Sequence, residues 1–109
     1  EHTPAVYNDP VLAKKIFGNF TVLFGEEKVV SLSPEMFGED FGWYGRQEPG
    51  VPTLIYSVGS VSPEKMADAK KNNRTIPSTH SSAYLPDLEP SLRTGVLSMS
   101  SAALFLLKK

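Results

Sequence analysis

Two short segments, residues 28–33 (KVVSLS) and 51–59 (VPTLIYSVG), constrain the fold of this 109-residue chain more than any other feature. Their β-branched and aromatic residues predict strands, and Pro34 ends the first. Seventeen residues separate Ser33 from Val51, which is enough for a crossover between parallel strands. We therefore expect an α/β fold with the two strands as neighbours in a right-handed βαβ unit.

Two strands are too few for a stable parallel sheet, because such sheets need several members and helices on both faces. Both segments have the apolar character of strands that are buried on both faces, yet the sequence contains no further strand to cover them. We therefore expect the chain to be part of a larger α/β domain.

The first helix is predicted from a local start signal. Asp9 can cap free backbone amides, and Pro10 suits the first helical position. Leu12, Ile16 and Phe20 recur every four residues and form an apolar stripe. Gly25 is a suitable residue to end this helix.

Further helices are expected at three places. Ser62-Pro63 opens one that runs to about Lys71, and Glu89-Pro90 opens the last one. A short helical piece is expected near residues 40–44, and residues 72–87 read as a long polar loop. The apolar stripe of the last helix is Leu92, Val96, Met99, Ala103 and Leu107.

Composition excludes several functional classes. The formal charge of −1, from 11 basic and 12 acidic residues, argues against a nucleic-acid surface. No apolar run approaches the roughly 20 residues of a membrane span. The absence of cysteine excludes thiolate metal sites and cysteine nucleophiles, and it leaves the compartment, cytoplasmic or periplasmic, open. Neither a serine nucleophile elbow nor a glycine-rich phosphate loop is present.

Candidate site residues follow from the predicted topology. Ligands of open parallel sheets bind beyond the carboxyl ends of the strands, and the loops leaving those ends carry Glu39, Asp40 and His80. His80 reads either as a surface or capping histidine or as a metal ligand or acid–base group. Glu39 and Asp40 read either as a solvated helix start with Asp40 as the cap, which the residues alone favour, or as a pair of which one carboxylate orients a ligand.

The order of the motifs resembles a known family. Asn8-Asp9-Pro10 opens a helix, Met36 to Phe41 ends in Glu-Asp-Phe, and Pro49-Gly50 precedes the segment that ends at Gly59. His80-Ser81 and a final helix containing Gly95-Val96 follow. Over nearly its whole length the chain resembles the C-terminal segment of the metal-dependent amidohydrolases and aminoacylases, dizinc exopeptidase-like enzymes that include the hippurate hydrolases and the hydrolases of indole-acetyl amino acids.

The resemblance implies a fold and a cofactor. Residues 1–109 would be the C-terminal portion of a catalytic α/β domain, a partial three-layer sandwich with a mostly parallel sheet flanked by helices. Residues 1–7 would be the exit from an inserted lid and dimerisation domain. The full-length active site would hold two divalent metal ions, zinc, manganese or cobalt, and this segment would contain an incomplete part of that site.

The resemblance also implies roles for residues. His80 would be a metal ligand, and Glu39 and Asp40 would lie beside the site as substrate-binding or ligand-orienting residues. No catalytic residue is expected within this segment, so the 109 residues alone would be inactive. Two departures from the family pattern are Phe37-Gly38, where relatives usually have Gly-Ser, and a longer stretch over residues 60–79.

The parent enzyme would hydrolyse the amide bond of N-acyl amino acids or small peptides. Its expected partners are the N-terminal part of the same catalytic domain and further copies of itself in a homo-oligomer, with no nucleic acid and no membrane. The alternative is an independent small α/β binding or interaction module without catalysis. That module would be a monomer with covered strand edges, whereas a segment of a larger domain would expose apolar surface.

Overall fold

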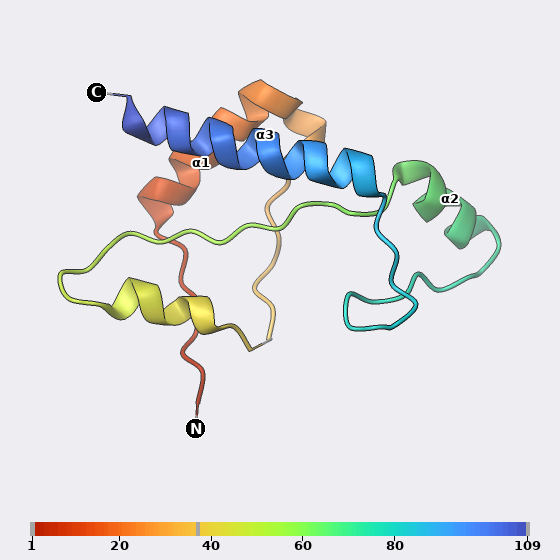
Figure 1. Ribbon diagram of the computed structural model, residues 1–109, viewed down its shortest axis with the longest axis horizontal. Helices are drawn as coiled ribbons and strands as arrows, with labels where there is room; N and C mark the ends of the chain where they lie inside the picture. The colour runs from red at the N-terminus through yellow and green to blue at the C-terminus, as the bar shows by residue number, and fades with distance from the viewer. Residues whose placement is uncertain (1, 37, 109) are drawn as a thin grey trace. The chain divides into compact units, whose positions relative to one another are not determined.

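The computed structural model describes residues 2–36 and 38–108, and these contain helices joined by long irregular segments (Figure 1). Phe37, part of the stretch before Glu-Asp-Phe, lies outside the described residues, as do Glu1 and Lys109 at the ends of the predicted domain. The helical elements, in chain order, are α1 (Pro10–Phe24), the 3-10 helices η1 (Glu26–Lys28) and η2 (Asp40–Arg46), α2 (Pro63–Lys71) and α3 (Leu88–Leu107).

The predicted α/β fold is wrong for this chain, which is helical. Residues 28–33 and 51–59 form no strand, and no sheet occurs within the described ranges. A β-rich sequence becomes a strand only where a neighbouring strand takes up its backbone hydrogen bonds. The two segments do not pair with each other, so the expected βαβ unit is absent as well.

The helix starts follow the predictions closely. Asp9 caps α1, with its carboxylate accepting a hydrogen bond of 2.7 Å from the Leu12 amide, and Gly25 ends the helix. The Ser62 hydroxyl accepts from the Lys65 amide at the start of α2, which ends at Lys71 as expected. The last helix begins one residue before Glu89.

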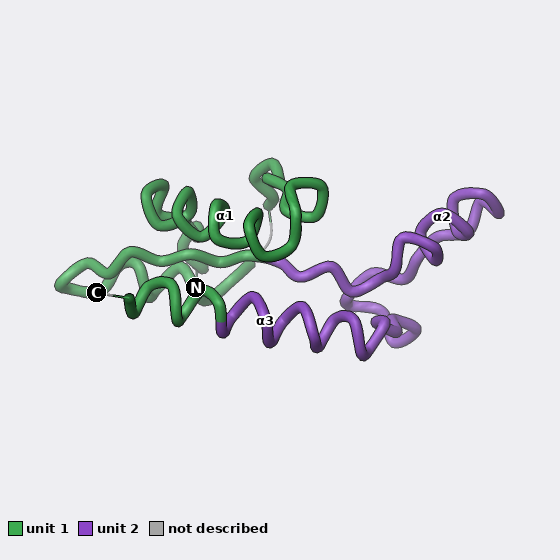
Figure 2. Tube along the Cα trace, turned by 90° about the horizontal axis from the view of Figure 1, so that it is seen from above, with its two compact units in different colours: residues 1–56, 101–109 green, residues 57–100 purple. Residues whose placement is uncertain are grey.

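The chain divides into two compact units, which Figure 2 shows in different colours. The first unit contains residues 1–56 and 101–109, and the second contains residues 57–100. The core of the first unit consists of Ile16, Phe20 and Ala102. The rings of Phe20 and Tyr56 meet edge to face with their centroids 5.0 Å apart.

Asn8 occupies the place of a strand partner beside the irregular segment 51–56. Its side-chain amide accepts a hydrogen bond from the Ile55 N–H at 2.8 Å and donates to the Ile55 carbonyl at 2.9 Å. One residue further on, the Asp9 N–H donates to the Thr53 carbonyl at 2.9 Å. This segment is therefore held by one side chain and one amide, where a sheet would supply a full ladder.

The apolar stripe predicted for α3 is not buried. The buried residues of this helix are Ser98 and Ala102, whereas Leu92, Val96 and Met99 are each about 60% exposed or more. The pattern predicted an apolar face on this helix, and the structure leaves that face exposed. None of the helices in the described part of the chain is both long and apolar enough to cross a membrane.

Candidate functional site

His80 lies in the middle of a hydrogen-bonded turn. The Ser81 N–H donates to the Ser78 carbonyl at 2.9 Å, and the Tyr84 N–H donates to the Ser81 carbonyl at 3.0 Å, so two turns follow each other. The imidazole is exposed, and it has no hydrogen-bond, ion-pair or ring partner among the residues that the structure describes. The backbone of this turn is therefore fixed while both ring nitrogens stay available.

The loop that carries His80 is closed at its base. The Asp87 N–H donates to the Ser60 carbonyl at 2.8 Å, and the Tyr84 hydroxyl pairs with the Ser60 hydroxyl. Asp87 also starts α3, because its carbonyl accepts from the Ser91 N–H at 3.1 Å and from the Ser91 hydroxyl at 2.7 Å. These contacts bring together the two ends of a segment that contains α2 and the His80 turn.

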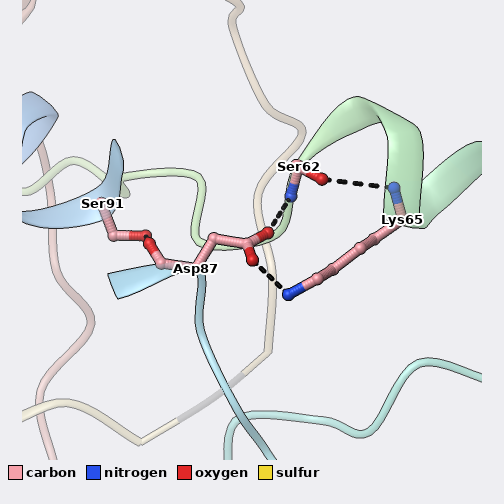
Figure 3. A network of polar contacts seen from close by, with 4 residues as sticks. All are labelled: Ser62, Lys65, Asp87 and Ser91. Carbon is pink, nitrogen blue, oxygen red and sulfur yellow. Dashed lines mark hydrogen bonds and ion pairs between the residues drawn. The ribbon is translucent and has the colours of Figure 1, made fainter. Parts of the chain in front are cut away.

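The Asp87 carboxylate joins this base to α2 (Figure 3). It accepts a hydrogen bond of 2.7 Å from the Ser62 N–H and forms an ion pair with Lys65. The ammonium group of Lys65 and the Ser62 amide hold the pKa of Asp87 below its ordinary value of 3.8. We refer to the contacts of Asp87 with Ser60, Ser62 and Lys65 as the Asp87 latch.

Glu39 and Asp40 stand at the start of η2. The Glu39 carboxylate accepts a hydrogen bond of 3.1 Å from the Phe41 N–H and so caps the helix. The helix-cap interpretation is therefore supported, but the capping residue is Glu39, whereas the sequence suggested Asp40. Asp40 is exposed, and its carboxylate is the one of the pair without a capping bond.

Asp40 lines a shallow hollow of about 360 Å³ together with His2, Thr3 and Trp43. The rings of His2 and Trp43 lie 6.2 Å apart between centroids. Nothing in the residue pattern indicates this proximity, because 38 positions separate His2 from Asp40.

A second, open hollow of about 450 Å³ lies in the same unit. Its polar residues include Asp9, Arg46 and Thr53, and its other lining residues include three glycines and Pro52. Asp9 already serves as the cap of α1, and no described carboxylate pairs with Arg46. The guanidinium group of Arg46 is thus the one cation that lines this hollow, beside the side chains of Asp9 and Thr53.

The predicted site residues belong to two different units of the chain. Glu39 and Asp40 belong to the first unit and His80 belongs to the second. The argument that placed them on one rim relied on the ends of two strands, and these strands do not form. Over residues 2–36 and 38–108, no three His, Asp or Glu side chains gather closely enough to hold a metal ion. His80 presents an accessible imidazole, which is a side chain of the metal-ligating type.

Comparisons with protein-family models, with curated proteins and with solved structures give no match to this chain.

Proposed function

We propose that this chain is a segment of a larger metal-dependent amidohydrolase or peptidase, in which His80 supplies one ligand to a divalent metal ion. The observation that carries this proposal is the unpartnered imidazole of His80, presented on a turn whose backbone hydrogen bonds are satisfied. A histidine binds a metal ion through a ring nitrogen that is free of other contacts, and this turn restrains the backbone that carries the ring.

The exposed apolar surface supports the view that the rest of the site lies outside this segment. Apart from proline and glycine, only four apolar residues of the described chain are buried, and they are Ile16, Phe20, Ala69 and Ala102. Large apolar side chains such as Val22, Met36 and Leu107 are more than 75% exposed. Monomeric proteins rarely expose apolar surface on this scale, so further protein is expected to cover it.

Each residue of the segment then has a limited task. A bound divalent ion would supply Lewis-acid chemistry, polarising the amide carbonyl of an N-acyl amino acid or small peptide. His80 would hold the ion through a neutral ring nitrogen, and the Asp87 latch would keep the His80 turn in place. Glu39 caps the start of η2, and Asp40 beside it has an exposed carboxylate.

The test is metal analysis of the full-length hydrolase that contains this segment. The variant His80→Ala should lose about one of two bound ions and at least about a hundredfold in activity, since loss of a ligand removes the polarising charge. The matched control is His2→Ala, which changes the other histidine of the segment and should leave both quantities unchanged. Full metal content and activity in His80→Ala would refute the ligand role.

A further inference from the structure

The open hollow that Arg46 lines is bordered by three segments of the first unit that are far apart in the sequence. These segments are residues 5–9, 42–46 and 50–53, and the hollow that they border measures about 450 Å³. This volume lies within the range of about 300–1,000 Å³ that is usual for small-molecule sites. The hollow is therefore large enough for a metabolite of the size of an amino acid.

The three segments contact one another pairwise. The Asp9 N–H donates a hydrogen bond of 2.9 Å to the Thr53 carbonyl, which joins the first segment to the third. A Cβ atom placed on Gly45 would lie 2.9 Å from the Thr53 hydroxyl oxygen, so the second and third segments touch there. A Cβ atom placed on Gly42 would lie 3.0 Å from the Ala5 carbonyl oxygen, so the first and second touch as well. The walls of the hollow are thus held together by the chain itself, as in a pre-formed ligand site.

Two opposite charges line the hollow without neutralising each other. Among the described residues, no carboxylate pairs with the Arg46 guanidinium group, and no cation pairs with Asp9. Asp9 accepts the Leu12 N–H with its Oδ1 atom, which leaves Oδ2 for a further donor. A ligand that satisfies both groups must therefore carry an anionic group and a cationic group.

We propose that this hollow binds a small zwitterion, an α-amino acid, with its carboxylate on Arg46 and its ammonium group on Asp9. A guanidinium group can donate two parallel hydrogen bonds to one carboxylate. A multiply charged anion such as phosphate fits less well, because the negative charge of Asp9 lines the same hollow. Tyr7, Val51 and Pro52 also line it and offer apolar surface to the side chain of the amino acid.

The test is an NMR titration of the 109-residue chain, labelled with ¹⁵N-glycine, with L-leucine as the probe. Three of the eight glycines line the hollow, and they are Gly42, Gly45 and Gly50. Their amide signals should shift with a millimolar or lower dissociation constant, while the signals of the other five stay in place. N-acetyl-leucine lacks the ammonium group and leucinamide lacks the carboxylate. Each should bind at least about tenfold more weakly than L-leucine, because a charged group of the site loses its partner.

Two substitutions test the assignment of the charges. The variant Arg46→Gln should bind L-leucine at least about tenfold more weakly, and its affinity for leucinamide should not change. Asp9→Asn should also bind L-leucine at least about tenfold more weakly, without any loss of affinity for N-acetyl-leucine. Asparagine caps a helix as well as aspartate does, so α1 should be retained, which circular dichroism checks. The matched control Arg74→Gln changes an arginine of the second unit and should leave binding unchanged.

Several results would overturn the proposal. They are the absence of any shift at the three glycines, equal shifts at all eight, equal affinities for L-leucine and N-acetyl-leucine, and undiminished binding of L-leucine by Arg46→Gln. This site is independent of the proposed hydrolase function, since it uses no residue of the unit that contains His80. The titration needs no metal ion, so its outcome is separate from that of the metal analysis of His80→Ala.

Discussion

Gly42 is the residue at which a side chain has the least room in the described chain. A Cβ atom placed there would lie 2.7 Å from the Pro4 carbonyl oxygen and 3.0 Å from that of Ala5. Both atoms belong to the backbone, so they cannot rotate away as a flexible side chain would. The residues preceding α1 therefore rest against η2 at a point where only glycine fits.

The variant Gly42→Ala should lower the free energy of unfolding by about 1–3 kcal/mol, because the neighbouring backbone must shift. Gly50→Ala is the matched control, since a Cβ atom there meets nothing within 4 Å. Urea denaturation followed by the fluorescence of Trp43 measures both. Equal stability of the two variants would show that Pro4 does not pack against η2.

Sequence signals at the scale of single residues were informative only where they were local. The caps Asp9 and Ser62 were predicted because each acts within three residues of itself. The contact of Gly42 with Pro4 and the pairing of Asn8 with Ile55 had no such signal, because the partners are 38 and 47 positions apart. The exposed position of His80 within a polar loop was predicted, whereas the proximity of Asp40 to His2 was not.

At the scale of elements, the accuracy of a prediction depended on how many of the element's hydrogen bonds must be made with other elements. α2 satisfies most of its backbone hydrogen bonds internally, so its bounds could be read from a cap, a proline and the residues that follow. The segments 28–33 and 51–59 would need partner strands that this sequence does not contain, and they form no strand. The stripe of α3 likewise identifies an apolar face without saying which protein covers it.

The Asp87 latch joins α2 to the start of α3, and it can be tested by titrating the Asp87 carboxylate. The Ser62 N–H donates to the Asp87 carboxylate, so its proton chemical shift should follow the protonation of that group. The pKa of Asp87 is lowered by Lys65 and Ser62, so the latch is present above pH 3.8 and is lost as the pH falls further below that value. An NMR titration should give a midpoint below 3.8, and a midpoint at or above it would contradict the latch.

Removing the charge of Asp87 should loosen the segment between Ser60 and Asp87. The variant Asp87→Asn loses the ion pair with Lys65, and trypsin should then cleave after Lys70, Lys71 and Arg74 several-fold faster because local opening becomes more frequent. Glu89→Gln, which removes the exposed ion pair with Arg93, is the control and should leave the cleavage rate unchanged. If both variants are cleaved at the rate of the parent chain, the latch does not hold the loop.

At the scale of the whole molecule, the buried core is small. Within the first unit it consists of Ile16, Phe20 and Ala102, with partly buried residues such as Leu54 and Tyr56 packed against them. Losing one large member of so small a core removes much of what holds the unit together. Because few residues form the core, many apolar side chains of the described chain remain exposed.

The variant Phe20→Ala should therefore cost about 3–5 kcal/mol and unfold the first unit at room temperature. Val22→Ala, two residues along α1 and 90% exposed in the parent chain, should change stability by less than about 0.5 kcal/mol. Near-ultraviolet circular dichroism, which reports on the packing of Phe20 against Tyr56, distinguishes the two. A retained aromatic signal in Phe20→Ala would show that the first unit is held together in another way.

The central claim is that His80 binds a divalent metal ion in a larger hydrolase, and crystallography tests it most directly. Anomalous diffraction from crystals of the full-length enzyme, recorded at the absorption edge of its metal, should place an anomalous peak about 2.0–2.1 Å from a ring nitrogen of His80 if the ion is zinc. An occupied metal site elsewhere, with the His80 ring free in solvent, would contradict the account.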